Sequence, residues 1–141
     1  MAQRSWYVCV DPGPFLDPEI YLTSWRGTRW DGPVLTADAL PAPGNENGVY
    51  ARPMGWTPGP YFFWGGTHDS RPKAYGTVAL TGRVIQGLQG YRAERATIRE
   101  LWLWTPPGPV FLANVRELLE QRYQCHVHLD EAPPWTDWVY L

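Results

Sequence analysis

The chain has 141 residues, the size of one domain, and we expect residues 1–141 to fold as a single unit. Its formal net charge is -2, so it lacks the basic excess that is typical of proteins whose main partner is nucleic acid. No apolar run has the length of a membrane span or of a secretory leader, so we expect a soluble, cytoplasmic protein with reduced cysteines.

The N-terminal part of the chain predicts two strands. In residues 5–10, Trp6, Val8 and Val10 would share one face of a short strand, and Tyr7 and Cys9 the other. Residues 19–25 have the composition of a second strand.

The segments that follow are rich in glycine and proline. Residues 26–33 predict a turn, and residues 33–60 predict mostly loop. Within this loop, residues 41–48 are expected to be the most exposed and the most tolerant of change, and residues 49–51 to form a brief strand.

The clearest pattern in the chain is a β-hairpin. Residues 75–84 alternate apolar and polar side chains, residues 86–90 have the length and the glycines of a hairpin loop, and residues 91–104 predict a long returning strand. Gly82 interrupts the first strand where a β-bulge is expected. The final residues 101–104 are apolar on both faces, which indicates burial on both sides.

A helix and a short strand are predicted after the hairpin. Apolar residues recur at helical spacing in residues 110–123, and the main helix is expected there. Residues 125–129 predict a strand with Val127 and Leu129 turned inward. The expected fold is therefore α+β, with six to eight short, mostly antiparallel strands that could form a partly open barrel.

Three segments resemble a family of small, uncharacterised actinobacterial and actinobacteriophage proteins. Residues 76–94 are similar to its signature GxVALxGxV…GYRAE, residues 47–51 to its element CGIYA, and residues 118–127 to its closing segment. The resemblance implies an accessory role in a phage or mobile element and no particular reaction. Relatives carry Cys and His with zinc-like spacing before CGIYA, but Asn47 stands here in place of a cysteine, so no metal is implied.

The hairpin supplies the first candidate binding residues, Tyr91, Arg92 and Glu94, together with Arg83. Arg92 and Glu94 share a strand face and predict an ion pair, or else a guanidinium placed for carboxylate or phosphate recognition. The nearby arginines are otherwise expected to form a solvated face; they are Arg83, Arg92, Arg95 and Arg99.

Aromatic residues supply the second set of candidates. Trp56, Tyr61 and Trp64 lie among glycines and prolines, where they could form an exposed rim for a partner or pack in the core. His68 beside Asp69 is a weak candidate for binding or hydrolysis. Elsewhere, Cys125, His126 and His128 have a metal-like pattern, but no further ligand is near them in the sequence, and we expect no metal.

The sequence has no nucleophile elbow, phosphate loop or zinc-protease motif, so we expect no catalytic residues and no cofactor. The favoured function is that of a non-enzymatic intracellular protein that binds a host protein. One alternative is a PUA-like nucleic-acid-binding domain, which the acidic composition disfavours. Another is a nucleotide or small-molecule sponge that acts in anti-defence, and a hydrolase is the least favoured.

Overall fold

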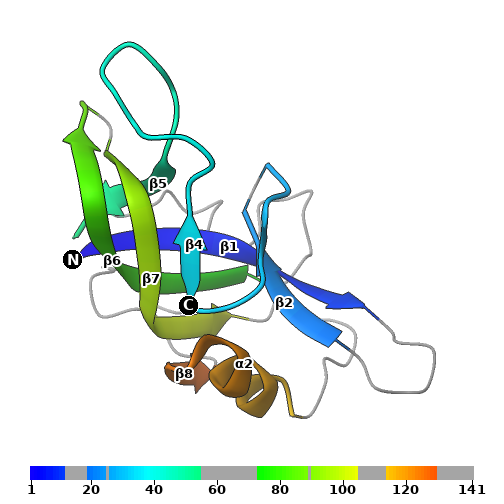
Figure 1. The fold of residues 1–141 in the computed structure, drawn as a ribbon. Helices are drawn as coiled ribbons and strands as arrows, with labels where there is room; N and C mark the ends of the chain where they lie inside the picture. The colour runs from blue at the N-terminus through cyan, green and yellow to red at the C-terminus, as the bar shows by residue number, and fades with distance from the viewer. Residues whose placement is uncertain (12–18, 25, 55–72, 89, 105–113, 130–141) are drawn as a thin grey trace, which may run out of the picture.

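The computed structural model describes residues 1–11, 19–24, 26–54, 73–88, 90–104 and 114–129. Within these ranges the chain is β-rich, with eight strands in one mixed sheet and one α-helix, which confirms the α+β class (Figure 1). The strands are β1 (Ala2–Asp11), β2 (Glu19–Thr23), β3 (Arg29–Trp30), β4 (Val34–Thr36), β5 (Val49–Pro53), β6 (Lys73–Gln86), β7 (Tyr91–Trp104) and β8 (His126–Leu129); the helix is α2 (Val115–Tyr123).

The predicted hairpin is confirmed as β6 and β7, the two longest strands (Figure 1). Gly82 has a φ of +77°, and the register of the two strands shifts between Thr81 and Val84, so the predicted bulge is present. Gly90 has a φ of +153°, and a Cβ added there would lie 2.5 Å from the carbonyl oxygen of Ala51. The turn therefore requires glycine at this position.

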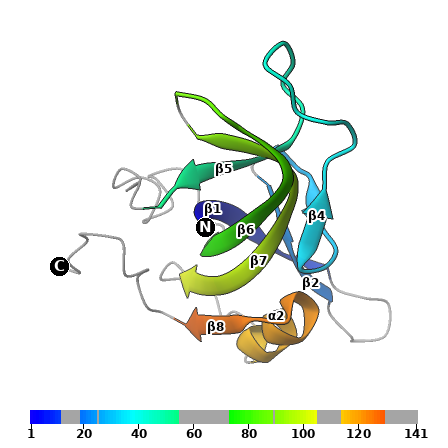
Figure 2. The same ribbon diagram turned by 60° about the vertical axis from the view of Figure 1, so that its left-hand side comes forward.

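The long hairpin curves, and its two strands pair with different neighbours along their length. β1 pairs with residues 73–78 of β6, while β5 pairs with residues 91–93 of β7. β1 and β5 also pair with each other at their ends, so the pairing β1–β6–β7–β5 returns to β1 (Figure 2). All described strand pairs are antiparallel except β7 with β8.

The core lies against the inner face of β1 and β2. Trp6 and Trp30 are fully buried and meet edge to face, with their ring centroids 5.4 Å apart. Leu101, Trp102 and Leu103 are all buried, which confirms the expectation of burial on both faces of β7 for these three residues.

Helix α2 packs beside β2 and β8 and places Tyr123 in the core (Figure 1). The Tyr123 hydroxyl donates a hydrogen bond to the carbonyl oxygen of Trp30, and it accepts one from the amide of Leu22, both at 2.7 Å. Burial raises the pKa of Tyr123 to about 12. This one side chain joins the end of the helix to β2 and β3.

Several expectations differ from the structure. β3 lies within the predicted turn at residues 26–33, and β4 lies within the predicted loop, because both segments pair with other strands. Leu129 is exposed, although it was expected to face inward. The helix ends at Tyr123 as predicted, and the proposed start at residues 110–113 lies outside the described residues.

In the part of the chain that the structure describes, no helix has the length and apolar character needed to cross a membrane.

Candidate ligand-binding site

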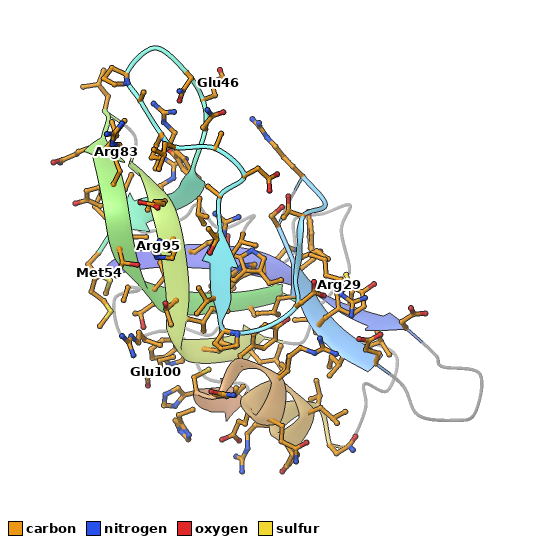
Figure 3. All side chains as sticks on the ribbon, in the orientation of Figure 1. Arg29, Glu46, Met54, Arg83, Arg95 and Glu100 are labelled. Carbon is orange, nitrogen blue, oxygen red and sulfur yellow. The ribbon has the colours of Figure 1, made fainter. Side chains whose placement is uncertain are left out.

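A cavity of about 990 Å³ lies among β1, β4, β5 and the connection from β4 to β5. Its described lining includes two carboxylates, Asp38 and Glu46, and Glu46 lies on the connecting loop (Figure 3). Four arginines also line it, namely Arg4, Arg26, Arg52 and Arg92. The described charges of the lining are therefore mostly positive, which favours an anion.

Arg4 lies on β1, on the same face as the core residue Trp6. Its guanidinium carbon lies 6.0 Å from the centroid of the Trp6 ring and 5.5 Å from that of Trp30. Its Nη1 donates a hydrogen bond to the backbone carbonyl of Tyr50 on β5. Burial lowers the pKa of Arg4 to about 10, because the charged form has lost part of its hydration.

Three buried N–H groups of Arg4 and of the two tryptophans beside it have no hydrogen-bond partner among the described residues, and of these three residues Arg4 lines the cavity, whereas Trp6 and Trp30 do not. They are Nε of Arg4 and the indole Nε1 atoms of Trp6 and Trp30. Most buried polar groups in proteins are hydrogen-bonded, and leaving a donor unpaired is unfavourable. The unpaired Nε of Arg4, beside the cavity, is therefore a candidate contact for a ligand or for water.

Arg92, the central candidate of the hairpin, bonds to the loop between β4 and β5. Its Nη2 donates to the carbonyl of Ala42 at 3.1 Å, and its Nη1 donates to the carbonyls of Asn47, at 3.0 Å, and Asn45. The prediction that Arg92 forms an ion pair with Glu94 is therefore wrong. The residues predicted to be an exposed, tolerant loop are instead tied to β7 by this side chain.

Glu94 has partners of its own. Its carboxylate accepts a hydrogen bond from the backbone amide of Arg83 at 3.0 Å and pairs with Arg95 at 3.2 Å. Arg83 is exposed on β6 and Arg95 lies on β7 (Figure 3), while Tyr91 packs partly buried against the core. The hairpin candidates are thus dispersed, and among them Arg92 alone lines the cavity.

Asn45 organises the same loop and was missed in the sequence. Its side-chain oxygen accepts hydrogen bonds from the amides of Ala42 and Asn47, at 3.0 and 3.1 Å. An asparagine after Pro-Gly is a signal for such a side-chain turn. The remaining candidates, Trp56, Tyr61, Trp64 and His68, lie outside the described residues.

His126 and His128 share a face of β8, as predicted, with their ring centroids 4.3 Å apart. His128 stacks on Trp102 at 4.8 Å and hydrogen-bonds through Nε2 to Glu100. Within the described ranges, no group of three or more His, Cys, Asp or Glu side chains is arranged to hold a metal ion.

Arg4 is a candidate site residue that was not predicted from the sequence. The sequence signal is alternation: Arg4 lies on the same strand face as three apolar residues, which are Ala2, Trp6 and Val8. An arginine on such a face requires partners for its donors, which makes it a candidate site residue.

No protein-family model, curated protein or solved structure matches this chain. The site is therefore interpreted from its own geometry.

Proposed function

We propose that the protein binds a small anionic molecule in the cavity beside β1, without acting on it chemically. The observation that carries this proposal is Arg4, whose buried Nε has no partner among the described residues. This is the small-molecule or nucleotide sponge considered from the sequence, with Arg4 in place of Arg92 as the central residue. The strands β1, β6, β7 and β5, whose pairing returns to β1, then act as a small, partly open barrel beside the cavity.

The energetics of Arg4 support a role in binding. Desolvation of a guanidinium is unfavourable unless its donors are paired, and only Nη1 of Arg4 has a hydrogen-bond acceptor among the described residues. An anion would supply the missing acceptor and restore the balance of charge. The volume of about 990 Å³ lies at the upper end of the range for small-ligand pockets, so a molecule of nucleotide size can enter.

Titration calorimetry with a panel of anions tests this function. The panel contains inorganic phosphate, acetate, AMP and ADP at constant ionic strength, and at least one should bind to the full chain. Arg4→Gln should weaken that binding by about tenfold or more, because a charged hydrogen bond is lost.

Arg83→Gln is the matched control, because Arg83 is exposed and does not line the cavity. It should leave the affinity unchanged. Equal loss of affinity in both variants would indicate general charge attraction, and the absence of binding by every anion would refute the proposed function.

A host protein, the partner favoured from the sequence, is the second candidate. Leu88 is fully exposed at the hairpin tip, and Val84 and Tyr50 are 41% and 38% exposed. A hollow of about 360 Å³ lies beside Leu88, and Arg83 is exposed on the same hairpin. An acidic and apolar segment of a partner would fit this surface. Leu88→Asp should abolish co-purification of a stoichiometric partner, and unchanged co-purification would refute this candidate.

The resemblance of residues 76–94 supports a cytoplasmic accessory role in an actinobacterial phage or mobile element. In that setting, capture of a small anion or of a host protein would serve anti-defence.

A further inference from the structure

We infer that Arg4 holds the ligand through the edge formed by its Nε and Nη2 atoms, so that the anchoring group of the ligand is an oxyanion with two acceptor oxygens. This inference rests on the proposed function and names the chemical group that the cavity recognises. A carboxylate and a phosphate share this chemistry.

The hydrogen-bond donors of the Arg4 guanidinium are only partly paired. Nη1 of Arg4 is used by the Tyr50 carbonyl, and Nε is buried without a partner in the described part of the chain. Nη2 likewise makes no hydrogen bond to a described residue. The Nε–H and one Nη2–H of an arginine point in parallel, and their spacing matches two oxygens of a carboxylate or phosphate. Arg4 therefore has a two-point donor edge that is unpaired among the described residues.

Arg4 is also held in place before any ligand arrives. The rings of Trp6 and Trp30 lie against the guanidinium, and the Tyr50 carbonyl fixes its Nη1 end. A donor that is already oriented loses little conformational entropy on binding. The unpaired edge is thus a preorganised feature of β1 and its neighbours.

Arg29 provides an internal example of the same edge when it is filled. Its Nε donates to Asp31 at 2.7 Å, and its Nη2 donates to Glu19. The protein thus satisfies this edge with carboxylate oxygens where its own chain supplies them. At Arg4 no described carboxylate takes that place.

The two indole N–H groups bear on which oxyanion is preferred. Nε1 of Trp6 and Nε1 of Trp30 are unpaired within the described structure, and both rings lie against the Arg4 guanidinium. A phosphate carries more acceptor oxygens than a carboxylate, so participation of an indole donor would favour phosphate.

The test is nuclear magnetic resonance of the ¹⁵N-labelled full chain, observing the Arg4 Nε–H and the indole N–H signals. The probes are inorganic phosphate, acetate and chloride, at equal ionic strength. The Arg4 Nε–H signal should shift saturably with phosphate, with acetate or with both, but not with chloride. A shift of the Trp6 or Trp30 indole signal with phosphate would assign the site to phosphate, and a response to acetate alone would assign it to carboxylates.

Arg4→Lys is the decisive variant, because it retains the positive charge but lacks the two-point edge. The dissociation constant of the preferred probe should rise by about tenfold or more relative to the wild type. If Arg4→Lys binds as tightly as the wild type, the edge inference is overturned although anion binding stands. If the wild-type Nε–H signal responds to no probe while calorimetry detects binding, the edge is again refuted. If calorimetry also detects nothing, the proposed function fails with it.

Discussion

Arg4 and Arg29 both lie against aromatic rings, but the hydrogen-bond donors of their guanidinium groups are paired differently. Arg29 lies 3.9 Å from the Tyr21 ring centroid, and its Nε and Nη2 donors are taken by Asp31 and Glu19. Arg4 lies against Trp6 and Trp30, and the same two donors have no partner among the described residues. The first arginine completes the fold, whereas the second leaves a donor edge for something outside it.

The surroundings of Arg29 form an anchor, defined as Glu19, Arg29, Asp31, Arg122 and Tyr123 (Arg29 is labelled in Figure 3). Arg122 of α2 donates to Glu19 at 2.8 Å and to the backbone carbonyl of Asp31 at 3.1 Å. The hydrogen bonds from Arg122 and Arg29 lower the pKa of Glu19. The anchor therefore ties the helix to β2 and β3 by paired groups, whereas the Nε of Arg4 is unpaired among the described residues.

The largest effect is expected at the centre of the anchor. Tyr123→Phe removes the hydroxyl and leaves the buried amide of Leu22 and carbonyl of Trp30 without this partner. We expect a loss of about 2–4 kcal/mol in the free energy of unfolding, measured by urea denaturation, with unchanged anion affinity. Tyr91→Phe is the control, because Tyr91 is only partly buried, and it should change stability by less than about 0.5 kcal/mol. Equal effects of the two variants would mean that the anchor is not the stabilising feature.

The same tyrosine predicts how stability depends on alkaline pH. The folded-state pKa of Tyr123 is raised to about 12, above the value of about 10 that applies to an unfolded chain. Its contribution is thus fully present below pH 10 and is lost as the pH rises from 10 to 12, by roughly 2–3 kcal/mol. Denaturation at a series of pH values should show this fall in the wild type and a shallower fall in Tyr123→Phe. Parallel curves for the two proteins would contradict the assignment.

Substitution of Arg4 should change the free energy of unfolding in the opposite direction to Tyr123→Phe. Arg4→Met keeps a long side chain but removes the desolvated charge, so the free energy of unfolding should rise by about 1–2 kcal/mol while anion binding is lost. Arg29→Met, the matched change in the anchor, should lower stability, because it leaves Asp31 and Glu19 without this partner. Thermal denaturation and calorimetry measure the two effects. A similar loss of stability in both variants would show that Arg4 is a structural residue.

The hairpin could be predicted because its signals are local. The alternation over residues 75–84 and the break at Gly82 act between near neighbours, and the structure confirms the paired strands and the bulge. Gln86, which was expected to begin the loop, is instead the last residue of β6 and pairs with Tyr91. The inward face of β1 was also predictable at Trp6 and Val8. In each case a single strand and its pleat decide the outcome.

The elements that were missed depend on distant partners. β4 is three residues long and is defined by its pairing with Arg95–Thr97 of β7, about sixty residues later in the chain. Arg92 reaches across a similar separation to the carbonyls of Ala42 and Asn47, so its neighbour Glu94 was a misleading guide to its partner. Arg4 could be suspected from its place on the apolar face of β1, but its unpaired edge appears only when the position of the Tyr50 carbonyl is known.

The smallest effect on stability is expected at Arg92, whose hydrogen bonding is intermediate between that of Arg4 and that of Arg29. Its donors are used, but by loop carbonyls instead of carboxylates, so Arg92→Lys should lower stability by only about 1 kcal/mol. Hydrogen exchange should quicken at the amides of Ala42 and Asn47, which the Asn45 side chain holds in the same loop. Arg95→Lys, which alters a partly exposed pair with Glu94, is the control and should leave both exchange rates unchanged. Because Arg92 shapes one wall of the cavity, anion affinity should fall less in Arg92→Lys than in Arg4→Lys. A larger fall at Arg92 would move the anion site from β1 to the hairpin.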